Sequence, residues 1–182
     1  MKKILSTIIL TMAVIMNAFA QISLTATVGT LGPTGYSTLK AAFDAVNAGT
    51  HKGVITIQVT ASTTEAASAV LNANGNGSAS YTAISIYPTT TGLSISGNLP
   101  APLIDFNSAD FVTIDGRVNQ TGTTPDLTIM NTSTSNAAAT STIRFIVDAC
   151  DNTIKYCNLK GATTTTTGGI LYFAAGNLDQ GS

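Results

Sequence analysis

The sequence predicts an all-β protein, built as a right-handed parallel β-helix with a capping α-helix near its N-terminus. Short strands of alternating Ile or Val and Thr or Ser recur along the chain, and most end at Gly, Asn or Asp. Some strands follow one another closely, as residues 104–106 precede residues 111–116. One amphipathic helix lies before the repeated strands, where the first coil of a solenoid needs a cap. Together these three observations favour stacked coils.

The first 20 residues have the pattern of a secretory signal peptide. Lys2 and Lys3 precede a largely apolar run over residues 4–19, and Ala18-Phe19-Ala20 offers small residues at a cleavage point. The apolar run is shorter than the roughly 20 residues that span a bilayer. We therefore expect export and cleavage after Ala20, with no membrane span in the remaining chain, and a location outside the cell or on its outer surface.

Residues 21–53 are expected to form an N-terminal strand and the capping helix. The strand is predicted over residues 22–28 and the helix over residues 38–48, with Ser37 as a plausible N-cap and Gly49 just after the last turn. Four apolar residues recur at helical spacing and predict one buried stripe: Leu39, Ala42, Phe43 and Val46.

Residues 54–182 are expected to form the coils. Branched apolar residues alternate with polar ones in each strand, which predicts one buried and one wetter face. An antiparallel sandwich also has short, regularly spaced strands, but the closely paired strands and the cap favour the β-helix. The predicted strands cover residues 54–59, 83–87, 93–97, a segment near Leu103, and residues 111–116, 127–131, 143–147, 152–156 and 170–173.

Two segments carry a family resemblance. Residues 36–49, YSTLKAAFDAVNAG, followed by residues 53–59, GVITIQV, look like the entry of pectin-lyase-like β-helix proteins. The phrases FVTIDG (residues 111–116) and NTIKYCNLKG (residues 152–161) resemble the coils of large cell-surface proteins that bacteria export by type IX secretion. The resemblance implies a capping helix that feeds the first strand. It also implies a C-terminal sorting domain, and none is visible.

No closing cap is visible at the C-terminal end either. We therefore expect the coils to be incomplete, as in a chain truncated at its C-terminus. The last coil of a solenoid without a cap exposes apolar side chains and unpaired strand edges. We accordingly expect self-association through the last coil, near residues 170–173.

Four acidic residues are the strongest candidates for chemistry: Asp105, Asp110, Asp115 and Asp126. In the resembled family, lyases hold Ca²⁺ with clustered carboxylates and use a basic residue to abstract a proton, for which Arg117 or Arg144 would be the candidates. Turns, however, also favour Asp, as before Gly116 and after Pro125. We therefore assign no catalytic, cofactor-binding or metal-binding residue, and leave calcium binding at the turns as an open alternative.

The remaining candidates favour ordinary structural roles. Cys150 and Cys157 fit two small buried thiols better than a disulfide, although export would permit pairing. His51, the one histidine, is interpreted as a loop residue. Four tyrosines could stack on sugar rings if they lined one face, but ordinary packing is the more common role of such residues. They are Tyr81, Tyr87, Tyr156 and Tyr172.

Composition limits the function further. Charged residues make up only 9% of the 182-residue chain, and the net charge is −1, so nucleic-acid binding has no support. The sequence favours a non-catalytic structural or adhesive module of the cell surface, with polysaccharides or surface glycans as partners. The alternative is an extracellular polysaccharide lyase or glycoside hydrolase, with its active site in missing coils or near the turns from Asp105 to Asp126.

Overall fold

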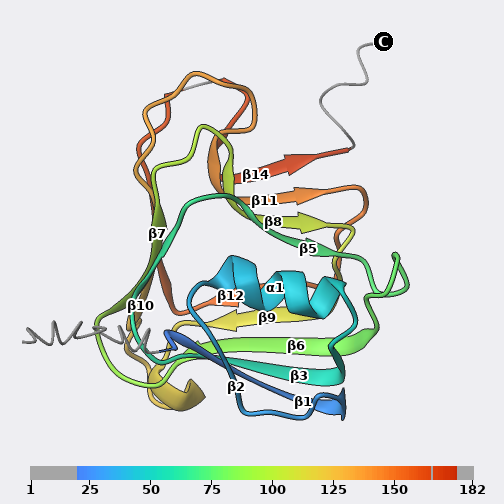
Figure 1. Cartoon of the computed structure of the whole chain (residues 1–182). Helices are drawn as coiled ribbons and strands as arrows, with labels where there is room; N and C mark the ends of the chain where they lie inside the picture. Colours follow the sequence, from blue (N-terminus) through green and yellow to red (C-terminus); the bar gives the residue numbers. More distant parts are fainter. Residues whose placement is uncertain (1–19, 165, 176–182) are drawn as a thin grey trace, which may run out of the picture.

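The strands of this protein stack as parallel coils around a common core, which confirms the predicted β-helix architecture (Figure 1). The computed structural model describes residues 20–164 and 166–175. The predicted signal peptide lies outside these residues apart from Ala20. Within the described residues there are four coils, and each coil contributes one strand to each of three sheets.

Strands of one sheet are separated by a whole coil in the sequence. Sheet A has the order β12-β9-β6-β3, followed by β1 (Ile22–Gly29) and β2 (Thr34–Tyr36), which precede the coils. Sheet B has the order β13-β10-β7-β4, and sheet C the order β14-β11-β8-β5. The coils consist of β3 (His51–Val59), β4 (Thr63–Glu65) and β5 (Ala69–Asn72); β6 (Tyr81–Pro88), β7 (Leu93–Gly97) and β8 (Pro102–Asn107); β9 (Val112–Asp115), β10 (Leu127–Asn131) and β11 (Ser141–Ile146); and β12 (Thr153–Lys155), β13 (Cys157–Gly161) and β14 (Gly169–Ala174).

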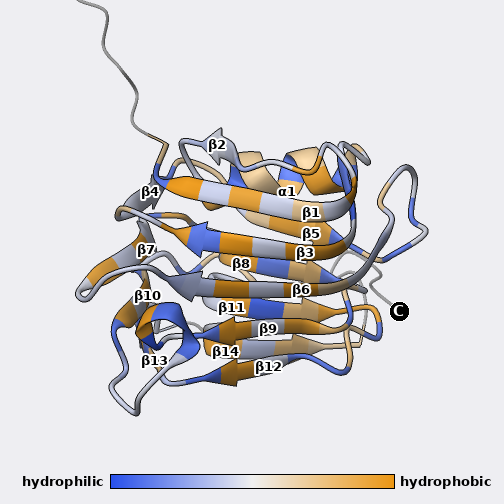
Figure 2. Ribbon diagram, turned by 90° about the horizontal axis from the view of Figure 1, so that it is seen from below, coloured by the Kyte–Doolittle hydropathy of each residue, from blue (hydrophilic) through white to orange (hydrophobic). Residues whose placement is uncertain are grey.

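Period-two alternation produces the core. Along sheet A, Ile57, Ile86, Ile114 and Ile154 occupy equivalent positions on four successive strands. Figure 2 shows the resulting bands of hydrophobic and polar residues along these strands. On the inner side of sheet C, Phe106, Phe145 and Phe173 also lie in register, with ring centroids 5.2 and 4.8 Å apart.

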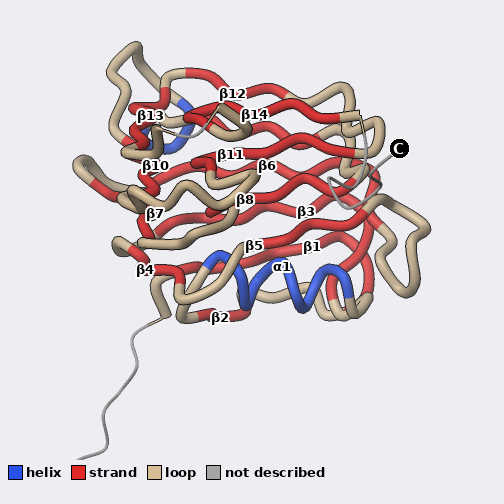
Figure 3. The backbone as a smooth tube through the Cα atoms, turned by 90° about the horizontal axis from the view of Figure 1, so that it is seen from above, coloured by secondary structure: helices blue, strands red, loops and turns tan. Residues whose placement is uncertain are grey.

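The N-terminal end of the stack is covered by β1 (Ile22–Gly29), β2 (Thr34–Tyr36) and the helix α1 (Leu39–Asn47). The strand β1 pairs with β3 antiparallel, which ends the parallel repeat of sheet A. The helix packs beside β5 and buries the predicted stripe, including Phe43, whose ring lies 6.5 Å from that of Phe106. Figure 3 shows α1 and β2 at one end of the stack and β12, β13 and β14 at the other.

The predicted N-cap was wrong by one residue. Thr38, not Ser37, has the extended backbone of an N-cap, and its hydroxyl accepts a hydrogen bond from the Ala41 N–H at 3.1 Å. The predicted end of the helix is confirmed, because Gly49 has a φ of +71°, a left-handed conformation that glycine adopts easily.

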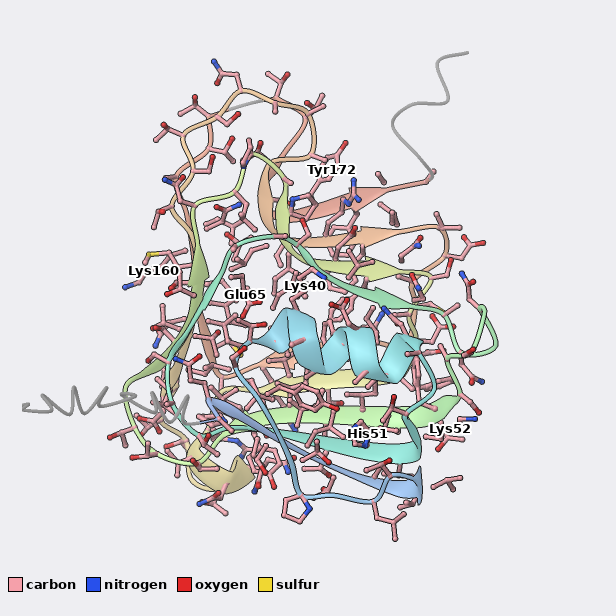
Figure 4. All side chains as sticks on the ribbon, in the orientation of Figure 1. Lys40, His51, Lys52, Glu65, Lys160 and Tyr172 are labelled. Carbon is pink, nitrogen blue, oxygen red and sulfur yellow. The ribbon has the colours of Figure 1, made fainter. Side chains whose placement is uncertain are left out.

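A buried glutamate joins the helix to the first coil. The carboxylate of Glu65, on β4, accepts hydrogen bonds from the backbone N–H groups of Leu39 at 2.9 Å and Lys40 at 3.0 Å (Figure 4). The first N–H groups of a helix have no partner within the helix, and the positive end of the helix dipole favours a negative charge. Glu65 therefore satisfies two buried donors and fixes the cap on the stack.

Asn131 has a similar structural role at the corner between sheets B and C. Its side-chain amide donates to the carbonyl oxygens of Leu99, Ala101 and Ser141 at 2.9–3.0 Å. Its oxygen accepts from the N–H groups of Leu99 at 3.0 Å and Ser133 at 3.2 Å. One buried side chain thus satisfies backbone groups of two successive coils, where no sheet can pair them.

Four strands were missed in the sequence: β2, β4, β5 and β13. Each is short, and β4 consists of Thr-Thr-Glu, which carries no apolar alternation. The interpretation of both cysteines as buried was also wrong for Cys150, which is exposed, whereas Cys157 is half-buried on β13. Both thiols are free.

Replacement of Glu65 by Ala is expected to destabilise the protein by about 1–3 kcal/mol, because two helix N–H groups would lose their partner in a buried place. Asp44→Ala is the matched control, since it removes an exposed carboxylate that pairs with Lys40 on the same helix and should cost less than about 0.5 kcal/mol. Chemical denaturation followed by circular dichroism measures both. Equal losses in the two variants would contradict this role of Glu65.

Self-association through the last coil is expected, because Phe173, Leu171 and Ile170 are exposed beside the outer strand edges of the described coils. Phe173→Asp should shift the protein towards the monomer in sedimentation velocity measured over a concentration series. Val28→Asp introduces the same charge at an exposed position of β1 and serves as the control. A wild-type chain that stays monomeric at every concentration would contradict the expectation.

Candidate functional site

The four aspartates singled out in the sequence lie in different surroundings rather than in one site. Asp105 is on β8 in sheet C, Asp110 is in the β8–β9 turn, Asp115 ends β9 in sheet A, and Asp126 precedes β10. Among the described residues, no group of three or more His, Cys, Asp or Glu side chains could hold a metal ion. The stacked coils separate carboxylates that are close in sequence.

Asp105 is paired with Arg144, the residue beside it on the next strand of sheet C. The Arg144 guanidinium donates through Nε to Oδ1 at 2.9 Å and through Nη2 to Oδ2 at 2.7 Å. This two-pronged contact with Asp105 raises the pKa of Arg144 above its ordinary value. Arg144 therefore stays charged and is unsuited to abstract a proton.

Asp115 has a comparable environment on sheet A. The Arg117 guanidinium donates to its two oxygens at 2.9 and 2.6 Å, and Lys155 Nζ lies 3.4 Å from Oδ2. The hydrogen bonds from Arg117 are the main cause that lowers the pKa of Asp115. Arg117 also lies over the ring of Tyr156, 4.4 Å from its centroid. The arrangement fixes a turn rather than activating a base.

His51 is not a loop residue, as the sequence suggested, but the buried first residue of β3. Its Nδ1 lies 2.6 Å from the carbonyl oxygen of Thr30, so Nδ1 must carry the hydrogen. Its Nε2 then accepts from the hydroxyl of Tyr36 at 2.7 Å. The imidazole thus joins β3 to the N-terminal cap, and both ring nitrogens have protein partners.

An open cleft lies where the chain passes from sheet C back to sheet A. We call it the corner cleft, and it encloses about 310 Å³. The β5–β6 and β8–β9 connections supply its lining together with the start of β6. The residues that line it are Asn74, Tyr81, Thr82, Asp110 and Phe111.

Phe111 is held with its ring in solvent. Its side chain is 57% exposed and its backbone has a φ of +58°, a region that is costly for a bulky residue. Asn152, from the next coil, holds the backbone on both sides: it donates to the Ala109 carbonyl at 2.7 Å and accepts from the Val112 N–H at 2.9 Å. The carbonyl of Phe111 accepts from the Ile84 N–H at 3.1 Å. The exposed ring is therefore set by a network that spans three coils.

The polar groups of the corner cleft are also held in place. Asp110 Oδ1 accepts from the Cys150 N–H at 2.7 Å, and Asn74 Oδ1 accepts from the Tyr81 N–H at 3.1 Å. Tyr81 is buried, its hydroxyl donates to the Asn72 carbonyl at 2.6 Å, and its pKa is raised, mainly by burial and then by the charge of Asp110. Tyr81 is therefore a neutral phenol at physiological pH.

The neighbouring Cys150 is not an activated nucleophile. The hydrogen bond between the Cys150 side chain and Asp110 is the main cause that raises the pKa of the thiol to about 11. A thiol must ionise to react quickly, and the nearby carboxylates oppose ionisation. The corner cleft therefore combines an aromatic ring, an amide, a hydroxyl and a carboxylate, without a reactive group among them. Such a set of groups binds ligands by stacking and hydrogen bonding.

The tyrosines that might have formed a sugar-stacking face do not share one. Tyr81 is buried behind the corner cleft, Tyr87 accepts a hydrogen bond from Gln58, Tyr156 lies under Arg117, and Tyr172 is beside Arg144. The sequence therefore pointed to Asp110 and Tyr81 but missed Phe111 as the exposed ring. The sequence signal for this exposed ring was a Phe at an outward-facing position of a strand with alternating apolar residues.

Comparisons with known proteins give no identity: no family model, no curated protein and no solved structure matches this chain. Within the described part of the chain, none of the helical structure is long and apolar enough to span a membrane.

Loss of the Asp115–Arg117 pair is expected in acid. Because the pKa of Asp115 is lower in the folded protein, the pair stabilises the fold above the ordinary carboxyl pKa of about 4, and this contribution disappears as the pH falls through the lowered value. Asp115→Asn should therefore flatten the decrease in the free energy of unfolding below about pH 4. Urea denaturation over a pH series measures the slopes, and identical slopes for wild type and variant would contradict the assignment.

Proposed function

We propose that this protein is a secreted or cell-surface structural module that binds glycans and leaves them chemically unchanged. The pattern of residues 1–20 and the scarcity of charged residues support export to the outside of the cell. The parallel β-solenoid supports a stiff scaffold, because successive coils are joined by continuous hydrogen-bonded sheets.

The observation that carries the proposal is a register of uncharged polar side chains on the outer faces of the sheets. On sheet A, Thr56, Ser85, Thr113 and Thr153 occupy equivalent positions on four successive strands. Sheet B presents Ser94, Thr128 and Asn158 in the same manner. Adjacent strands are about 4.8 Å apart, so hydroxyl and amide groups recur at a regular interval. Such a surface suits the many hydroxyl groups of a polysaccharide.

The state of the carboxylates supports binding rather than turnover. Lyases and hydrolases need a group that can accept or donate a proton near neutral pH. Asp105 and Asp115, by contrast, each have both oxygens bound by an arginine. These two ion pairs stabilise the fold. A module that only binds glycans needs no free carboxylate as an acid or base.

Incubation with neutral and acidic polysaccharides, with and without Ca²⁺, tests the proposal. We expect the chain to be retained on one or more polysaccharides, with neither reducing nor unsaturated ends released. Asp105→Asn and Asp115→Asn should bind as the wild type does, provided that circular dichroism shows them folded. Released ends that disappear in these variants would contradict the proposal and favour the lyase or hydrolase.

A further inference from the structure

We propose that the corner cleft is a subsite for one neutral hexose unit of a glycan, and this inference rests on the proposed glycan-binding function. The corner cleft is distinct from the outer hydroxyl faces, because it is concave and contains an aromatic ring. Its volume of about 310 Å³ lies at the lower end of the range for small-molecule pockets, about 300–1,000 Å³. A single sugar ring rather than a long segment is thus the fitting occupant.

Phe111 supplies the apolar contact. One face of a hexose ring carries mainly C–H groups, and these pack well on an aromatic ring. Most of the Phe111 side chain is in solvent, and the backbone contacts of Ala109 and Val112 with Asn152 hold it there. Because the ring is already placed, binding requires little ordering of the site.

Asp110, Asn74 and Thr82 supply the polar contacts. Asp110 uses Oδ1 to accept from the Cys150 N–H, and that bond orients the carboxylate. Sugar hydroxyl groups are good donors to a carboxylate, and charge-assisted hydrogen bonds are stronger than neutral ones. The Asn74 amide, on the β5–β6 connection, and the Thr82 hydroxyl, at the start of β6, can donate and accept.

Charge determines the class of sugar. The lining contains one carboxylate and no basic side chain, and the phenol of Tyr81 is neutral. Two further acidic residues, Asp148 and Asp151, lie in the neighbouring β11–β12 connection. A uronate would bring its own carboxylate close to Asp110 with no cation in the lining to compensate. The corner cleft therefore favours neutral hexoses over acidic sugars.

Titration calorimetry with the full chain tests this inference. The ligands are tetrasaccharides of glucose, of mannose and of galacturonate. We expect a neutral tetrasaccharide to bind more tightly than the galacturonate. Phe111→Gly should weaken neutral binding by about tenfold, the size of an aromatic contact. Glycine tolerates the positive φ of this position, so the variant should remain folded. Leu31→Ala, at a position as exposed as Phe111, is the control and should bind as the wild type does.

Asp110→Asn tests the charge argument separately. Asparagine keeps an oxygen for the Cys150 N–H but removes the negative charge. Galacturonate binding should therefore strengthen, whereas neutral binding should weaken, because neutral hydrogen bonds replace charge-assisted ones. A wild type that prefers galacturonate, or unaltered neutral binding in Phe111→Gly, would overturn the subsite while glycan binding itself stands. A wild type that binds no tetrasaccharide and no polysaccharide would overturn the proposed function as well.

Discussion

Parallel pairing of each strand with its equivalent in the preceding coil is the constraint on which the other features depend. It places like side chains above one another, so an isoleucine ladder in sheet A and a phenylalanine ladder in sheet C form one continuous core. A slip of one residue would turn these ladders outward. The same register forms the outer rows of hydroxyl groups, and it brings Asn152 of the fourth described coil beside the backbone of Phe111.

Such a stack needs a defined beginning, because parallel pairing could otherwise continue at the exposed edge. Antiparallel β1 and the helix α1 provide it, and three polar contacts attach them to the first coil. Glu65 accepts from the helix N-terminus, Asn47 bonds to the backbone of β5, and His51 joins β3 to Thr30 and Tyr36. The cap is therefore fixed by specific hydrogen bonds as well as by the apolar stripe of the helix.

Local patterns predicted most of the fold but little of the candidate site. Alternation around Ile57, Ile86 and Ile114 was sufficient for the long strands, since each pattern lies within one segment. Short β4 was missed because the importance of Glu65 comes from a helix 25 residues away in sequence. The exposed ring of Phe111 likewise depends on Asn152, in another coil. The four aspartates are close in sequence, but the path of the coil places Asp105 in sheet C, Asp115 in sheet A and the other two in connections between strands.

Disulfide trapping tests the stacking of coils most directly. Thr64 and Ser96 are register partners on adjacent strands of sheet B, and Met130 is the partner of Ser96 one coil further along. In a background with Cys150 and Cys157 replaced by Ser, the pair Thr64→Cys and Ser96→Cys should form a disulfide, because a spacing of about 4.8 Å suits one. Thr64→Cys with Met130→Cys, two strand spacings apart, should not. Efficient trapping of the second pair, or failure of the first in a folded protein, would contradict the stacked register.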